Sequence, residues 1–188
     1  MPGRPPEGAL VLLDACCLIN LFATGRVEEV LARLPYRFAA SRFVVDHEVL
    51  ALAAGVRPDG SVEREVISPR GLEASGHLAV LDVESDHEQA VFVRFAAELD
   101  DGEASICALA VVHGAAVATD DRKALRLLGR PGVDVPTLQT PELLFEWALV
   151  SHTAEAEVAA VLRAVHDRGR FYPRRDAPRF DWWDAFFR

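Results

Sequence analysis

Apolar and polar positions along this chain form blocks of two kinds: short apolar runs, and longer segments with apolar residues at helical spacing. The short runs predict strands at residues 9–14, 36–40, 78–83, 115–118 and 133–135. The longer segments predict helices at residues 16–34 with a break at Thr24 and Gly25, 42–54, 86–98, 102–113 and 121–129, and one or two helices at residues 140–167. Strands separated by helices favour parallel pairing, so we expect an α/β fold whose central, mostly parallel sheet carries helices on its faces.

Two segments depart from this alternation. Residues 55–76 are rich in glycine and proline and predict an irregular excursion or a flexible connection. Residues 180–187 read FDWWDAFF, and such a run of large rings predicts either docking onto the protein's own core or an association surface. With 188 residues, 51% of them hydrophobic, we expect one domain at residues 1–150 and a helical and aromatic extension at residues 151–188.

Acidic residues lie where the pattern predicts buried structure. Asp14 closes the first predicted strand, and Asp120 and Asp121 follow the fourth, so they are expected at the carboxyl edge of the sheet, where ligands bind. Glu48 and Glu103 stand at helical spacing from apolar residues, which predicts side chains on a core-facing stripe. Carboxylates converge only if some are protonated or a cation lies among them. The pattern therefore predicts a divalent-metal site.

Each acid also has a purely structural alternative. Asp14 is then a solvated residue at a strand end, and Glu48 an exposed glutamate of a helix. Glu103 is the second half of a capping box that begins at Asp100, and Asp120 or Asp121 is an N-cap for the following helix. One of these alternatives alone is easy to accept, whereas the metal site is favoured over all four together.

The formal net charge of −9 argues against attraction of nucleic acid to the whole surface. It leaves room for a local basic surface, and Arg122, Lys123 and Arg126 directly follow the last acidic motif. These three residues are candidates for contacts to phosphate groups, or they form a solvated helix face.

Three cysteines, two of them adjacent at Cys16 and Cys17, provide neither a disulfide framework nor zinc-ligand spacing. We expect them to be small buried hydrophobic residues. The apolar runs are shorter than a membrane span, and the first residues lack the apolar stretch of a signal peptide, so we expect a cytoplasmic protein with no membrane partner.

The order of these motifs resembles the PIN-domain superfamily over roughly residues 9–135. The resemblance rests on the strand that ends in Asp14, on Glu48, on the run from Gly102 to Ala110 (GEASICALA), and on VATDDR at residues 117–122. The chain is most similar to the prokaryotic PIN proteins related to VapC toxins, whose third motif often reads Gly-Glu-Ala.

The resemblance implies a three-layer α/β/α sandwich and cleavage of RNA that depends on Mg²⁺ or Mn²⁺. The implied ligands are Asp14, Glu48, Glu103 and Asp121 or Asp120. It further implies the toxin of a type II toxin–antitoxin pair, a cognate antitoxin and a homodimer. The alternative is a noncatalytic PIN-like module that binds nucleic acid or protein. A haloacid-dehalogenase-type phosphatase would need a second aspartate where this chain has Cys16.

Three features differ from the family pattern. Many relatives have Thr or Ser and Asn after the first aspartate, whereas this chain has Ala15, Cys16 and Cys17, so a polar contact from these positions is expected to be missing. The usual Thr-x-Asp of the fourth motif fits Asp121, but Asp120 is equally available. Residues 136–188 exceed a minimal PIN toxin and are expected to cover the core, form a dimer contact or bind a partner.

Overall fold

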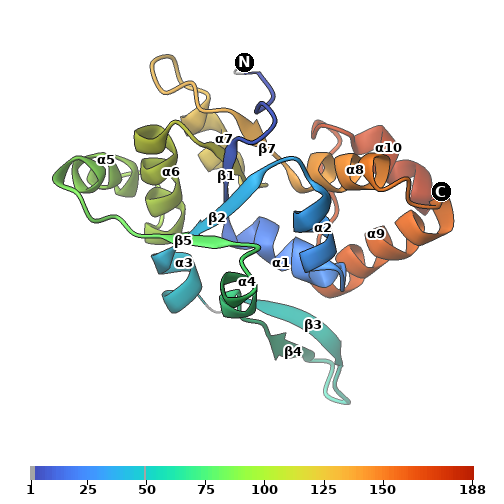
Figure 1. Cartoon of the computed structure of the whole chain (residues 1–188). Coiled ribbons are helices and arrows are strands. Elements are labelled where there is room, and N and C mark those ends of the chain that lie inside the picture. Colours follow the sequence, from blue (N-terminus) through green and yellow to red (C-terminus); the bar gives the residue numbers. More distant parts are fainter. Residues whose placement is uncertain (1–2, 49) are drawn as a thin grey trace. The chain divides into compact units, whose positions relative to one another are not determined.

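The computed structural model describes residues 3–48 and 50–188, and the chain forms two compact units (Figure 1). Unit 1 comprises Met1–Cys17, Pro35–Glu48 and Pro69–Leu138. Unit 2 comprises Leu18–Leu34, Val49–Ser68 and Gln139–Arg188. Each unit is therefore built from segments that are far apart in the sequence. The predicted boundary at residue 150 stays a prediction.

Unit 1 is built on a five-stranded sheet in the order β5-β2-β1-β6-β7, and each neighbouring pair is parallel. Its strands are β1 (Leu10–Leu13), β2 (Arg37–Ser41), β5 (Ala79–Leu81), β6 (Ala116–Ala118) and β7 (Thr137–Leu138). Val11, Leu12 and Leu13 of the central strand have no exposed surface, as expected for a parallel strand covered on both faces. The α/β fold class is confirmed, and a parallel sheet flanked by helices is consistent with a three-layer sandwich.

The helices of unit 1 follow the predicted alternation. They are α3 (Arg42–His47), α4 (Arg70–Ala74), α5 (Asp86–Ala96), α6 (Asp101–His113) and α7 (Arg122–Leu128), and α1 (Ala15–Ala23) begins in this unit. Helix α6 packs on β1, β2 and β6, and α5 packs on α6. Residues 104–110 of α6 are all buried because this helix lies between the sheet and α5.

The strand order fixes where a ligand would bind. From β1 the chain continues to β2 and β5 on one side of the sheet, whereas β6 and β7 extend it on the other side. The direction of strand addition reverses between the neighbours β1 and β6, and their carboxyl ends flank the crevice in which α/β proteins bind ligands. Asp14 follows β1, and Asp120 and Asp121 follow β6.

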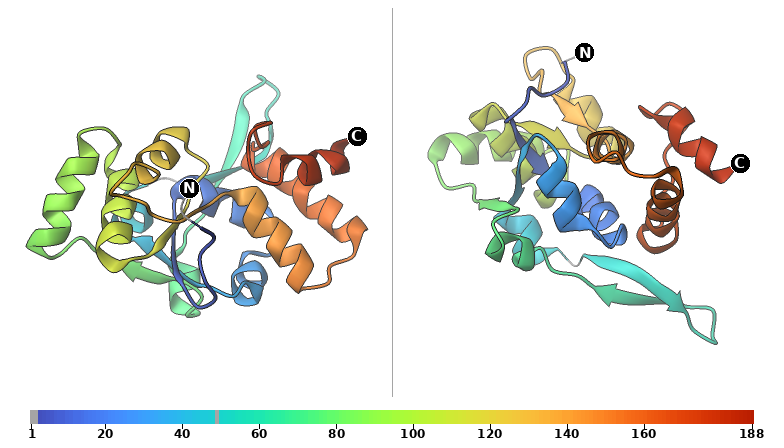
Figure 2. Two further views of the ribbon diagram at one scale, coloured as in Figure 1. Left: turned by 90° about the horizontal axis from the view of Figure 1, so that it is seen from above. Right: turned by 45° about the vertical axis from the view of Figure 1, so that its right-hand side comes forward.

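Unit 2 consists of helices and one hairpin. Its helices are α2 (Val27–Arg33), α8 (Thr140–Val150), α9 (Glu155–Gly169), α10 (Phe180–Asp184) and the 3₁₀ turn η1 (Ala185–Phe187), together with the rest of α1. Strands β3 (Ala51–Val56) and β4 (Val62–Val66) pair as an antiparallel two-stranded ribbon (Figure 2).

The aromatic end of the chain docks within unit 2. Trp183 has no exposed surface, and its ring lies 5.6 Å from that of Phe171. The ring of Trp182 meets Phe145 of α8 edge to face, and the guanidinium carbon of Arg179 lies 4.1 Å from the centre of the Phe145 ring. Docking, one of the two alternatives for this segment, is confirmed.

Three local predictions are wrong. The helix predicted at residues 42–54 ends at His47, and residues 51–56 form β3 because they pair with β4; Val49 lies outside the described residues. The predicted irregular excursion 55–76 contains the end of β3, β4 and α4, so about half of it is regular. The last strand lies at Thr137–Leu138 rather than at 133–135, because it pairs with Val117 and Ala118. In the part of the chain that the structure describes, every helix is too short or too polar to cross a membrane.

Candidate active site

Asp14 is fixed in position at the carboxyl end of β1. Its backbone N–H donates to the carbonyl of Ala118 at 3.0 Å, which continues the pairing of β1 with β6. Oδ1 accepts from the backbone N–H of Ala15 at 2.7 Å, and Oδ2 accepts from the Thr119 hydroxyl at 2.7 Å and the Cys16 thiol at 3.0 Å. Burial raises the pKa of Asp14, and these three hydrogen bonds oppose that effect. With 5% of its surface exposed, Asp14 is not a solvated residue at a strand end.

The two acids after β6 have different neighbours. The backbone N–H of Asp121 donates to Thr119 Oγ1 at 3.1 Å, and Asp121 Oδ1 accepts from two backbone N–H groups of α7 at 2.6 and 2.9 Å. Asp121 is therefore an N-cap, as one alternative predicted, and its negative charge also raises the pKa of Glu103. Asp120 lies beside the cysteines of α1, and its backbone N–H donates to Cys16 Sγ at 3.3 Å.

The expectation that no polar contact comes from the residues after Asp14 is wrong, because Cys16 makes such contacts. Its sulfur donates to the Asp14 carboxylate and accepts from the backbone of Asp120, and the side chain is only partly buried. Cys17 and Cys107 are buried, as expected. A thiol thus supplies a polar contact to the first aspartate of the site.

Glu48 follows α3 instead of lying within a helix, which corrects the stripe that its spacing predicted. Ser41 begins α3 as its N-cap, and the Ser105 hydroxyl of α6 donates to Ser41 Oγ at 2.8 Å, so the two helices are joined beside the site. The Glu48 carboxylate occupies the space that a Cβ on Gly102 would need. Gly102 therefore allows Glu48 to lie against the first turn of α6.

Burial and neighbouring acids raise the pKa of both glutamates. For Glu48 burial is the largest cause, followed by the charges of Asp14 and Asp100, and its pKa is about 7. For Glu103 burial is again the largest cause, followed by Asp100, Asp121 and Asp14, and its pKa is also about 7. Asp14, Glu48, Glu103 and Asp121 thus lie in one electrostatic environment, with Asp100 as a fifth acid.

Neither glutamate has a hydrogen-bond or ion-pair partner among the described residues. Within residues 3–48 and 50–188, no hydrogen bond or ion pair reaches the carboxylate of Glu48 or Glu103. Asp100 does begin α6 and accepts from the Glu103 backbone N–H at 2.9 Å, but over the same residues the Glu103 side chain makes no return bond, so the capping box is wrong. The place of Asp100 in the site was missed, although its position three residues before Glu103 is visible in the sequence.

The carboxylates fit a hard divalent cation. Their oxygens are the ligands that Mg²⁺ and Mn²⁺ prefer, and a cation would remove the cost of gathering like charges. No three of these carboxylates form a tight group: in the described part of the chain, three potential ligand atoms come within 4.8 Å of one another only at Cys16, Cys17 and Asp120. Mg²⁺ usually keeps several of its waters, so more widely spaced carboxylates can hold it through water.

The predicted phosphate contacts lie on α7. Arg122, Lys123 and Arg126 are all exposed. Lys123 is close enough to lower the pKa of Glu103, although its effect is smaller than that of the acids. Of the three, Lys123 has the clearest electrostatic link to the site.

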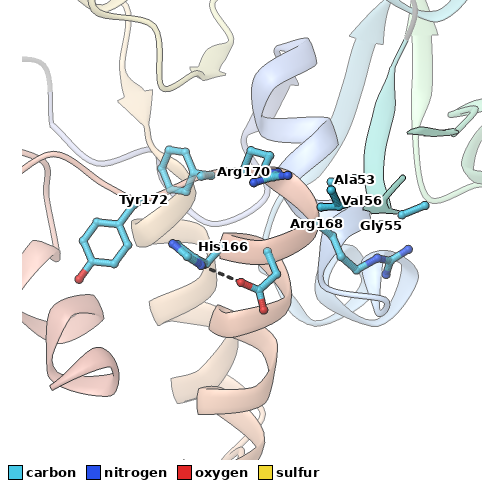
Figure 3. Close-up of a pocket in the computed structure, with 10 residues that line it drawn as sticks. Ala53, Gly55, Val56, His166, Arg168, Arg170 and Tyr172 are labelled. Carbon is cyan, nitrogen blue, oxygen red and sulfur yellow. Dashed lines mark hydrogen bonds and ion pairs between the residues drawn. The ribbon is translucent and has the colours of Figure 1, made fainter. Parts of the chain in front are cut away.

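A separate cavity of about 530 Å³ belongs to unit 2 and contains none of the predicted site residues (Figure 3). It lies between β3 and the end of α9 and is lined by two arginines, Arg168 and Arg170, and by the rings of His166 and Tyr172. Its acid, Asp167, forms a hydrogen bond with His166 Nδ1 at 2.8 Å.

Comparison of the chain with protein-family models gives no match, and comparison with curated proteins gives none either. The class that fold and site define is an α/β protein with acidic side chains gathered at the switch point of a parallel sheet.

Proposed function

We propose that this chain is a divalent-metal-dependent ribonuclease of PIN type that hydrolyses RNA phosphodiester bonds. The observation that carries the proposal is the pair Glu48 and Glu103. They come from different elements, have no structural partner among the described residues, and share acidic neighbours that help to raise each pKa to about 7. A cation accounts for this arrangement, and the order of the motifs supplies the reaction class.

Asp14, Glu48, Glu103 and Asp121 would hold Mg²⁺ or Mn²⁺, directly or through water. Such an ion, when bound, polarises phosphoryl oxygens and lowers the pKa of a bound water. The chain's own residues fix the carboxylates: the Thr119 hydroxyl orients Asp14 through Oδ2 and accepts from the Asp121 backbone. Asp121 is favoured over Asp120 because its charge acts on Glu103.

Lys123, Arg122 and Arg126 would bind the RNA backbone beside these carboxylates. All three are exposed on α7, with Arg122 and Lys123 in its first turn and Arg126 in its last. Their role would be to counter the repulsion between an acidic protein and a polyanion over a short stretch of surface.

The direct test is cleavage of end-labelled RNA and single-stranded DNA by the purified protein with Mg²⁺, Mn²⁺ or EDTA. Glu103→Gln removes one charge without changing the shape of the side chain, and we expect a loss of at least ~100-fold, since even residues that support metal ligands are worth 10–100-fold. Glu98→Gln is the matched control, because Glu98 is an exposed glutamate paired with Arg130. Equal cleavage by the Glu103 variant and wild type would disprove the assignment.

Folded protein that cuts neither substrate with either metal would favour the noncatalytic module. Calorimetry then separates a noncatalytic module from a nuclease with a very narrow substrate. The noncatalytic module would also show no heat of Mn²⁺ binding that depends on Glu103. The toxin role, a cognate antitoxin and a homodimer are implied by the resemblance alone. Gel filtration tests two of these: the protein purified alone shows whether it is a homodimer, and the protein with copurifying chains shows whether an antitoxin binds.

A further inference from the structure

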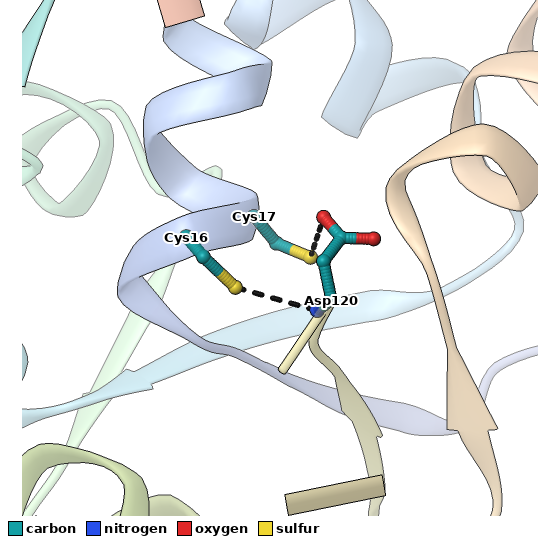
Figure 4. Close-up of side chains that lie close together, drawn as sticks. All are labelled: Cys16, Cys17 and Asp120. Atoms are coloured by element: carbon teal, nitrogen blue, oxygen red, sulfur yellow. Dashed lines mark hydrogen bonds between the residues drawn. The ribbon is translucent and has the colours of Figure 1, made fainter. Parts of the chain in front are cut away.

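Three ligating groups of unit 1 meet beside the carboxylate site. Cys16 and Cys17 are successive residues in the first turn of α1, and Asp120 follows β6 (Figure 4). The two sulfurs and a carboxylate oxygen all lie within 4.8 Å of one another, and Cys17 Sγ is 3.5 Å from Asp120 Oδ2. The pairing of β1 with β6 holds both elements in register, so the group does not depend on a loose loop.

The spacing suits a tetrahedral metal ion. Zinc binds sulfur at about 2.3 Å and carboxylate oxygen at about 2.0–2.2 Å, so neighbouring ligands of a tetrahedral site lie roughly 3.6–3.8 Å apart. The 3.5 Å from Cys17 to Asp120 already matches, and the 4.8 Å limit for the group requires a shift of about 1 Å at most. Three protein ligands with a fourth position left for water or substrate is a common zinc arrangement.

The donor set differs in kind from the neighbouring carboxylates. Thiolates select soft or borderline ions such as Zn²⁺, whereas carboxylates and water suit Mg²⁺ and Mn²⁺. Cys107 shows what a cysteine used only for packing looks like: it is 1% exposed and belongs to no such group in the described part of the chain. Cys16, by contrast, is partly exposed and already acts as a polar atom toward Asp14 and Asp120.

We propose that Cys16, Cys17 and Asp120 form a second metal site, which takes a thiophilic divalent cation such as Zn²⁺. Each thiol releases one proton to solvent as its sulfur becomes a ligand. The Cys16 sulfur then no longer donates to Asp14 Oδ2, and a positive charge lies beside that carboxylate. Zinc bound here therefore inhibits the Mg²⁺- or Mn²⁺-dependent reaction, a consequence that rests on the proposed function, whereas the binding itself does not.

The test of binding is titration of the reduced, chelator-treated full chain with Co²⁺, followed by displacement with Zn²⁺. Charge-transfer absorption from sulfur to Co²⁺ appears only when a thiolate is a ligand, so carboxylate binding does not produce it. We expect the absorption to saturate at one equivalent and to disappear in Cys16→Ser/Cys17→Ser. Glu103→Gln and Cys107→Ala should keep it, because neither residue belongs to the site.

Asp120→Asn keeps both thiols and covers the case in which the double variant does not fold. It should weaken Co²⁺ binding at least tenfold. Absence of charge-transfer absorption in wild type, its persistence in the folded double variant, or unchanged affinity in Asp120→Asn would each overturn the site.

In the cleavage assay, the zinc concentration that halves the activity should rise at least tenfold in Cys17→Ser. Charge transfer without any cleavage would leave the metal site standing and reject the ribonuclease.

Discussion

A single methyl group at Gly102 should separate folding from function. The Cβ of Gly102→Ala would occupy the place of the Glu48 carboxylate, with Asp100 Oδ1 a further 3.6 Å neighbour. The atoms in the way are the far end of a flexible side chain, so Glu48 can turn away at little cost. The substitution therefore displaces the Glu48 carboxylate from the site without replacing any predicted ligand.

Gly102→Ala should leave the stability of the fold equal or higher, whereas it should weaken Mn²⁺ binding. Alanine is favoured over glycine within a helix by about 1 kcal/mol, and less in the first turn, where Gly102 lies. Moving Glu48 away from Asp14 and Asp100 also relieves like-charge repulsion. We expect the free energy of unfolding to stay equal or to rise by up to about 1 kcal/mol, whereas Mn²⁺ affinity falls at least ~10-fold, as for other changes around metal ligands.

Urea denaturation, Mn²⁺ calorimetry and RNA cleavage measure the three quantities on the same preparation. Gly71→Ala is the matched control, because Gly71 is also helical and a Cβ there would meet nothing within 4 Å. A folded Gly102→Ala protein with wild-type Mn²⁺ affinity would refute the placement of Glu48 in the site. Destabilisation by more than about 2 kcal/mol, beyond the propensity scale, would show that Glu48 cannot turn away as argued.

Three further outcomes are expected. The raised pKa values of Glu48 and Glu103 mean that the folded wild type holds extra protons between about pH 4.5 and 7, and this stabilisation is lost as the pH rises through 7. Urea denaturation at several pH values with EDTA, without divalent cations, should show this loss in wild type but not in Glu48→Gln/Glu103→Gln. Thr119→Val should lower the free energy of unfolding by about 1–3 kcal/mol and weaken Mn²⁺ binding, because Asp14 loses its 2.7 Å donor; an unchanged denaturation midpoint would contradict this. Trp183→Ala should destabilise the protein by about 3–5 kcal/mol, measured by urea denaturation, because the side chain is fully buried, and a loss under 1 kcal/mol would argue against docking of the aromatic segment.

The sequence predicted the sheet well because its strands carry a local signal. Leu10–Leu13 and Ala116–Ala118 are apolar runs of strand length that pair with each other in the sheet. Asp14 directly follows the first run, and Thr119 separates the second run from Asp120 and Asp121. Asp14 and Asp121 could therefore be placed at the carboxyl edge from the sequence alone. The neighbourhood of β1 and β6, which defines the crevice, needed the structure.

The region around Glu48 could not be predicted in the same way. Val44, Val45 and Leu52 have the spacing of one helix face, yet only the first two lie in α3. Residues 51–56 become a strand because they pair with residues 62–66, and that pairing has no signal within a short window. The roles of Cys16 as a hydrogen-bond donor and of Gly102 as a space for Glu48 likewise depend on contacts between distant segments.

The acids of the site differ in how well the fold itself accounts for them. Asp100 and Asp121 cap helices, and such caps are found in proteins with no activity. Asp14 is held by three donors, which is enough to keep a buried carboxylate. Glu48 and Glu103 have no such role among the described residues, and each is harder to ionise than in water. Since a fold tolerates local conflicts mainly where function requires them, these two glutamates carry more weight for a metal site than the hydrogen-bonded aspartates around them.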